Sequence, residues 1–171
     1  MLEVCGLFIA YFIFVIVVWP ALLLPITSFK HYERGLEQMP FWLPSGWVFT
    51  LIWLVMFGLV TAAGIIYALT VPSSDVQVSD FYTAITALFI VNITLCHFWT
   101  VAFFRMHNAM LALADAVFLF LTASAVAALL AYIGEWLPFG LYVAYPIWLL
   151  VALIINGIWV ACVEPPRKRC D

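Results

Sequence analysis

Few side chains in this sequence are suited to acid–base or metal chemistry. His97 and Asp115 are the one histidine and the one carboxylate within its long apolar segments, and a single such pair is little material for proton transfer. The chain has no G-x-S-x-G, C-x-x-C-H, G-x-G-x-x-G or H-E-x-x-H motif, so it lacks the usual signatures of hydrolases, c-type haem attachment, dinucleotide binding and zinc proteases. We expect no metal site and no obligate cofactor, and these residues alone assign no catalytic group.

Aromatic residues offer a different kind of chemistry. The stretch 40–53, PFWLPSGWVFTLIW, contains three tryptophans and two prolines, whereas anchoring a helix end in lipid needs only one or two aromatic side chains. Flat indole rings pack well on flat apolar molecules. The sequence therefore predicts that this stretch helps to bind a planar apolar ligand.

The composition is that of an integral membrane protein. Of the 171 residues, 68% are hydrophobic and 9% are charged, against about half and about a quarter in soluble domains. The apolar runs are continuous rather than alternating, and helices satisfy their own backbone hydrogen bonds in lipid. Five runs are long enough to span a membrane: 4–24, 45–70, 81–104, 108–133 and 139–163. We predict an all-α fold, a single five-helix transmembrane domain followed by a basic tail at 164–171.

The charged residues predict an orientation. An antiparallel five-helix bundle gathers all six basic residues at one end: Lys30, Arg34, Arg105, Arg167, Lys168 and Arg169. It gathers acidic residues at the other end: Glu3, Asp75, Asp80 and Glu135. The positive-inside rule then places the N-terminus outside and the C-terminal tail in the cytoplasm. The long loop 25–44 lies at the basic end and is predicted to cover a binding site.

Helical spacing predicts three inward-facing stripes. At about 100° per residue, each of three helices aligns aromatic residues with small or amide residues: Phe49, Trp53 and Phe57; Asn92, Cys96, Trp99 and Phe103; Tyr145, Trp148, Ala152, Asn156 and Trp159. An asparagine gains nothing from lipid, so these stripes should face the interior and line one chamber beneath the loop. The alternative is that the amides only tie helices together and the aromatic rings only pack.

Two further expectations concern polar side chains. A carboxylate at membrane depth costs up to about 3 kcal/mol, and Asp115 is predicted at the same depth as His97 on the preceding helix. We expect the two to form a structural pair, in preference to haem ligation by His97. The four cysteines show neither metal spacing nor close pairing, so reduced thiols are expected.

These features resemble the TspO/MBR family, which comprises the tryptophan-rich sensory proteins and the mitochondrial translocator proteins once called peripheral benzodiazepine receptors. Four elements carry the resemblance in the same order: the stretch 40–53; Trp99 with Phe103 and Phe104; the ALAD sequence at 112–115; and Tyr145, Trp148 and Asn156. The chain departs from the family pattern at Thr50, often a proline, and at Cys96, where the family has asparagine.

The resemblance implies a membrane protein that binds tetrapyrroles such as protoporphyrin IX or haem, or related apolar ligands, for sensing or transport. It implies a set of ligand-binding residues: Trp42, Phe49, Trp53, Trp99, Tyr145, Trp148 and Asn156. Lys30 and Arg34 would contact the ligand from the loop. Animal members bind cholesterol, but the segment 156–160 lacks the tyrosine and basic residue of the sterol pattern. The expected partners are membrane lipid and such a ligand, without nucleic acid.

Several alternatives stay open. The chain is either a ligand-binding protein or a structural subunit of a membrane complex that keeps the fold without the pocket. A third function is light-dependent porphyrin breakdown, an enzymatic activity in which Trp53 and Trp148 would be the catalytic residues. Alanine spacing in the fourth predicted helix, at 112, 116, 123 and 127, allows close contact within the chain or in a homodimer. The membrane is bacterial, mitochondrial or an endomembrane.

Overall fold

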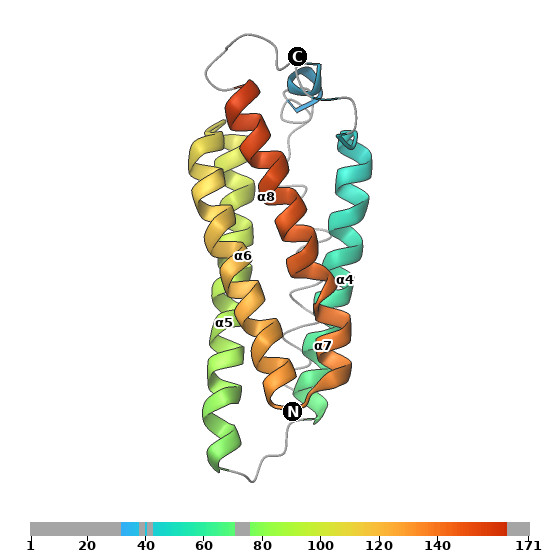
Figure 1. Cartoon of the computed structure of the whole chain (residues 1–171), viewed down its shortest axis with the longest axis vertical. Coiled ribbons are helices and arrows are strands. Elements are labelled where there is room, and N and C mark those ends of the chain that lie inside the picture. Colours follow the sequence, from blue (N-terminus) through green and yellow to red (C-terminus); the bar gives the residue numbers. More distant parts are fainter. Residues whose placement is uncertain (1–31, 38–39, 41–42, 71–75, 164–171) are drawn as a thin grey trace.

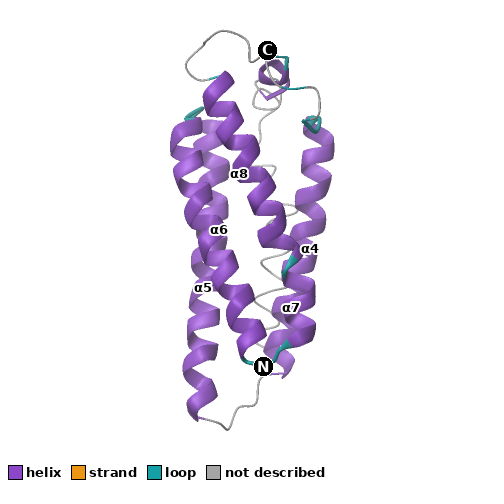
Figure 2. Cartoon of the chain, in the orientation of Figure 1, coloured by secondary structure: helices purple, strands orange, loops and turns teal. Residues whose placement is uncertain are grey.

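The computed structural model describes residues 32–37, 40, 43–70 and 76–163, apart from the side chains of 76–80. Every regular element in these ranges is a helix (Figure 2). The predicted first helix 4–24, the site residues Lys30 and Trp42 and the basic tail 164–171 lie outside the described residues.

The described helices match the remaining predicted runs. They are α4 (Gly46–Thr70), α5 (Val76–Thr100) with the π-helical turn η2 (Val101–Arg105), α6 (Ala109–Tyr132), α7 (Trp136–Tyr142) and α8 (Ala144–Cys162). By length and composition, four stretches of the described chain can cross a membrane: Gly46–Thr70, Phe81–Arg105, Ala109–Tyr132 and Trp136–Cys162. These spans define an all-helical, multi-pass membrane protein.

The last predicted helix, 139–163, is divided into two. α7 begins earlier than predicted, at Trp136, and α8 follows it after Val143. Pro146 explains the division, because proline has no N–H to donate to the carbonyl of Tyr142 one turn earlier, and its ring crowds that carbonyl. Within α8, Pro146 lies in the first turn, where a missing N–H is tolerated.

A π-helical turn ends the α5 segment. The N–H of Met106 donates to the carbonyl of Val101 at 2.9 Å, and the N–H of Asn108 donates to that of Ala102 at 3.0 Å. This wider turn accompanies the burial of two consecutive rings, Phe103 and Phe104. Asn108 then caps α6, since its side chain accepts a hydrogen bond from the N–H of Leu111 at 2.9 Å.

The helices pack in a definite order (Figure 1). α5 lies along α6, α6 also packs against α8, and α4 packs against α7 and α8. The four α6 alanines at 112, 116, 123 and 127 are all buried, so they serve contacts within the chain. We call the contact between α5 and α6 the α5–α6 seam.

The described arginines lie at one end of the bundle, where Glu33 and Glu37 also lie. The helical turn 32–36, which carries Arg34, lies at the same end as η2, which carries Arg105 (Figure 1). Glu135 lies in the turn between α6 and α7, at the opposite end. The direction of the bundle across a membrane stays a prediction.

One cysteine differs from expectation. Cys162 forms a disulfide whose partner lies outside the described residues, so the prediction of reduced thiols is wrong at this position. Sequence spacing does not reveal which chain segments meet in space, and their meeting decides whether two thiols can be joined. Cys96 is free and buried.

Candidate ligand-binding site

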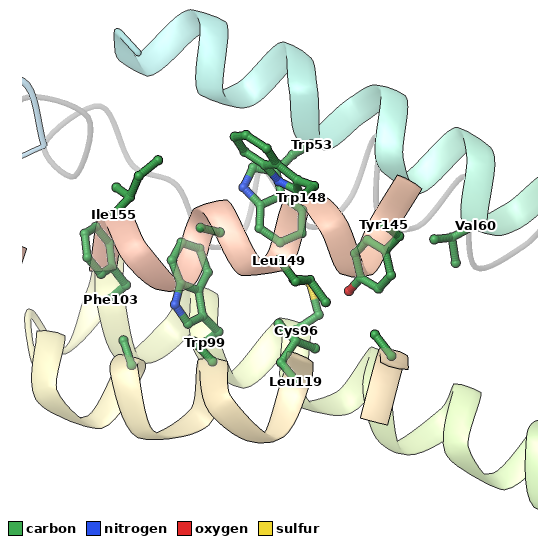
Figure 3. Close-up of a cluster of buried hydrophobic side chains, with 14 of the residues drawn as sticks. Trp53, Val60, Cys96, Trp99, Phe103, Leu119, Tyr145, Trp148, Leu149 and Ile155 are labelled. Atoms are coloured by element: carbon green, nitrogen blue, oxygen red, sulfur yellow. The ribbon is translucent and has the colours of Figure 1, made fainter. Parts of the chain in front are cut away.

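The three predicted stripes face the interior. All members of the α5 and α8 stripes are buried, including Phe103 in η2. On α4, Phe49 and Trp53 are buried and Phe57 is partly buried. Together they bring five rings from three helices into one group, which we call the aromatic cluster: Phe49, Trp53, Trp99, Tyr145 and Trp148. Figure 3 shows the three tryptophans and Tyr145 turned toward the space between the helices.

The rings of the aromatic cluster contact one another directly. Trp53 stacks on Trp99, with ring centroids 5.9 Å apart and planes inclined by 30°. It meets Trp148 edge to face at 6.2 Å and Tyr145 at 6.4 Å. Phe49 lies 5.6 Å from Trp148. These are favourable aromatic geometries, and they show that α4, α5 and α8 share one apolar centre.

The three indole N–H groups of the cluster differ in their hydrogen bonding. Nε1 of Trp99 donates to Oδ1 of Asn156 at 2.9 Å, and Nδ2 of Asn156 donates to the carbonyl of Ala109 at 3.0 Å. Nε1 of Trp53 and Nε1 of Trp148 are buried and have no hydrogen-bond partner among the described residues. A buried donor without a partner lowers stability by about 1–3 kcal/mol. The cluster thus holds two donors suited to an acceptor atom of a ligand.

The described part of the long loop covers the cluster. The ring of Tyr32 stacks on that of Trp159, with centroids 5.3 Å apart and planes inclined by 5°, and lies 5.9 Å from Phe49. A Cβ on Gly35 would lie 2.1 Å from Cη2 of Trp159, so only glycine fits there. The helical turn 32–36 of the predicted loop therefore packs over Trp159 and over Phe49 at the edge of the cluster.

Two hydrogen bonds fasten this turn to the start of α4. The hydroxyl of Tyr32 donates to the carbonyl of Pro44 at 3.2 Å, and Oε1 of Glu33 accepts from the N–H of Gly46 at 3.1 Å. A carboxylate at a helix N-terminus is favourable because it satisfies a free N–H and complements the helix dipole. Burial, together with the charge of Glu33, raises the pKa of Tyr32 to about 12.

The predicted site residues fall into three groups. Phe49, Trp53, Trp99, Tyr145 and Trp148 come together in the cluster, and Asn156 is hydrogen-bonded to one of them. Arg34 is exposed on the covering turn rather than directed into the cluster. Trp42 and Lys30 lie outside the part of the chain that is described. No group of three or more His, Cys, Asp or Glu side chains in that part could hold a metal ion.

The predicted pair of His97 and Asp115 does not form between the described side chains. Nδ1 of His97 lies 2.6 Å from the carbonyl of Ile93 in its own helix, and Oδ2 of Asp115 has no hydrogen-bond partner among the described residues. Equal depth along two antiparallel helices does not by itself make a pair, because the side chains must also point toward each other around their helix axes.

Sequence reasoning missed two features of the site. The sequence placed Tyr32 in the loop and assigned it no role. In the structure its ring packs on Trp159, beside Gly35. The π-helical turn that buries both Phe103 and Phe104 leaves no pattern in the sequence, because it adds one residue to an otherwise ordinary helix.

A bundle of long apolar helices around a buried group of aromatic rings defines an integral membrane protein with a candidate site for a flat apolar molecule. The sequence model of the TspO/MBR family matches residues 9–160, which is most of the chain. The chain belongs to the TspO/MBR family, and in general terms it is a ligand-binding or sensing protein of the membrane. A comparison with curated proteins found no significant match.

Proposed function

We propose that this protein binds a tetrapyrrole, such as protoporphyrin IX or haem, at the aromatic cluster, for sensing or transport. The observation that carries the proposal is the convergence of five rings from α4, α5 and α8, with two buried indole N–H groups that have no partner among the described residues. A porphyrin is a broad apolar disc with polar edges. Aromatic faces suit the disc, and the free N–H donors suit an acceptor atom on the ligand.

Binding between two rings requires them to separate. A flat guest needs a van der Waals distance of about 3.5 Å on each face, so two rings that sandwich it lie about 7 Å apart. Trp53 and Trp99 are at 5.9 Å. α4 packs against α7 and α8, and near Trp53 it meets α5 through the ring of Trp99. Outward rotation of the Trp53 ring can therefore widen the space between Trp53 and Trp99 without breaking the α5–α6 seam.

The charged end of the bundle supports a direction for the ligand. Arg34 lies on the covering turn and Arg105 ends η2, both exposed at the loop end. Porphyrin propionates directed toward that end would meet guanidinium groups, which bind carboxylates in a bidentate manner. Lys30 belongs to the same predicted loop. In the proposed orientation this end faces the cytoplasm.

Titration of the purified protein with protoporphyrin IX tests the proposal. We expect saturable quenching of tryptophan fluorescence, and a Kd raised at least about tenfold in Trp53→Ala and in Trp148→Ala, because losing a buried aromatic contact costs more than about 1.4 kcal/mol. Trp136→Ala is the matched control, since Trp136 is 68% exposed. Absent saturation, or equal affinity in all variants, contradicts the proposal.

The direct ring contacts favour one competing function. Rings that already fill the centre suit a structural subunit of a membrane complex, which would show no saturable porphyrin binding at any concentration and would copurify with other membrane proteins. Light-dependent porphyrin breakdown, with Trp53 and Trp148 as catalytic residues, is distinguished by loss of the pigment's absorbance under illumination with the wild type but not with the two tryptophan variants.

A further inference from the structure

The side chain of Asn156 joins three helices beside the aromatic cluster. From α8, its Oδ1 accepts a hydrogen bond from Nε1 of Trp99 on α5 at 2.9 Å. Its Nδ2 donates to the carbonyl of Ala109, the first residue of α6, at 3.0 Å. Asn156 is 1% exposed, so both arms of its amide are buried and bonded within the chain.

The two bonds make opposite demands on this side chain. An indole N–H can only donate, and a backbone carbonyl can only accept. The amide of asparagine meets both demands, with an acceptor on one arm and a donor on the other. Leucine at this position would have a similar size and would meet neither demand.

The bond from Asn156 fixes the orientation of the Trp99 ring. That ring lies nearly parallel to the ring of Phe103, with centroids 5.2 Å apart and planes inclined by 13°, and it stacks on Trp53 at 5.9 Å. Figure 3 shows the indole nitrogen of Trp99 at the edge of the ring turned away from Trp148. The ring therefore cannot turn over without losing its acceptor. Nε1 of Trp53 and of Trp148 have no such restraint among the described residues.

We propose that Asn156 is a positioning residue, which contacts no ligand itself and presents the face of Trp99 as the stationary wall of the binding site. This inference rests on the proposed binding of a flat ligand at the aromatic cluster. A ring already held in its binding orientation loses little further freedom when the ligand arrives, which favours affinity. The ligand is then admitted by movement of Trp53 or Trp148.

¹⁹F NMR of protein labelled with 5-fluorotryptophan tests the positioning without any ligand. We expect Asn156→Leu to shift or split the resonance of Trp99, because the ring then adopts other orientations. Asn92→Leu is the matched control, since this amide is 3% exposed and is bonded to Leu119 and Thr122 rather than to a tryptophan. An unchanged Trp99 resonance in Asn156→Leu, or an equal change in both variants, overturns the proposal.

Titration with protoporphyrin IX tests whether Asn156 acts through Trp99. The apparent Kd rises as the fraction of molecules with the ring in place falls, so we expect a rise of about tenfold in Asn156→Leu if a tenth of them keep it. Asn92→Leu should leave Kd unchanged. In a Trp99→Phe background, Asn156→Leu should have no further effect on Kd. An equal rise in both backgrounds would show that Asn156 meets the ligand directly, and it overturns the proposal.

Replacement of Trp99 by benzothienylalanine gives a second test that leaves Asn156 in place. This residue has the shape of tryptophan but no N–H, so the bond from Asn156 to Ala109 is kept and the test holds even where Asn156→Leu does not fold. We expect Kd to rise as in Asn156→Leu, and a Kd equal to that of the wild type overturns the proposal. A wild type that binds no porphyrin contradicts the proposed function alone, and the NMR comparison then decides the positioning.

Discussion

The α5–α6 seam and the aromatic cluster are both buried, yet they are built on different principles. In the seam, Nδ2 of Asn92 donates to the carbonyl of Leu119 at 2.9 Å and to Oγ1 of Thr122 at 2.8 Å, and α6 carries four buried alanines. In the cluster, the centroids of neighbouring rings lie 5.6–6.4 Å apart. Two indole N–H groups there lack partners among the described residues. The seam satisfies the amide of Asn92 within the chain, whereas the cluster contains two indole donors without a partner among the described residues.

This difference separates holding the fold from binding a ligand. Close contact between small residues and a satisfied amide stabilises helix pairs in lipid, where the hydrophobic effect gives little drive for association. Separating rings that touch edge to face loses less contact energy than separating interlocked small residues. We therefore expect the seam to resist changes in volume and the cluster to tolerate them.

Ala123→Leu should have the largest effect on stability. Ala123 is fully buried on α6, so three extra carbon atoms overpack α6 against its neighbours and should lower the free energy of unfolding by about 3 kcal/mol. Thermal unfolding in detergent measures the loss. Ala128→Leu is the matched control on the exposed face of the same helix and should change stability little. Equal effects would remove the distinction between seam and lipid face.

Asn156→Leu should cost more than Asn92→Leu. Loss of Asn156 leaves Nε1 of Trp99 without its acceptor, at about 2 kcal/mol. Loss of Asn92 removes the donor to two acceptors, but Oγ1 of Thr122 still donates to the carbonyl of Phe118. The expected loss of stability is about 0.6 kcal/mol, the mean for hydrogen bonds between membrane helices. Urea or SDS unfolding ranks the two. The reverse order would show that the seam depends on its amide more than the cluster does.

Gly35→Ala should loosen the cover of the cluster. Its Cβ would overlap the ring of Trp159, so the turn must shift, at about 1 kcal/mol. Gly157→Ala, with nothing within 4 Å of its Cβ, is the control and should stabilise α8 slightly, because alanine is the better helix former. Limited proteolysis in the loop measures the loosening. Unchanged cleavage in Gly35→Ala would mean that the turn does not hold the cover closed.

Tyr32→Phe should alter the pH dependence of stability by a small amount. The pKa of Tyr32 is raised from 10.0 to about 12, so between these values the unfolded chain has lost a proton that the folded chain keeps. Stability contributed by this group is therefore complete below pH 10 and is lost as pH rises toward 12. The wild type should lose more stability over this interval than Tyr32→Phe, as followed by unfolding at a series of pH values. Parallel curves would contradict the burial of this hydroxyl.

The inner faces could be predicted from the sequence because burial follows helical spacing. Tyr145, Trp148, Asn156 and Trp159 share one side of a helix whatever its neighbours are. The pair of His97 and Asp115 could not be judged in the same way, since depth along the axis is readable but rotation toward a neighbouring helix is set by packing. The contact of Tyr32 with Trp159 joins a loop to a distant helix, and no local pattern encodes it.

The central claim, that the aromatic cluster is the site for a flat ligand, is tested most directly by ¹⁹F NMR of protein labelled with 5-fluorotryptophan. Resonances are assigned by single Trp→Phe substitutions, and protoporphyrin IX is then added to the labelled wild type. The account predicts large ring-current shifts for Trp53 and Trp148, a smaller one for Trp99, and unchanged signals for Trp47 and Trp136, which are 70% and 68% exposed. Shifts confined to the exposed tryptophans, with Trp53 and Trp148 unmoved, would contradict it.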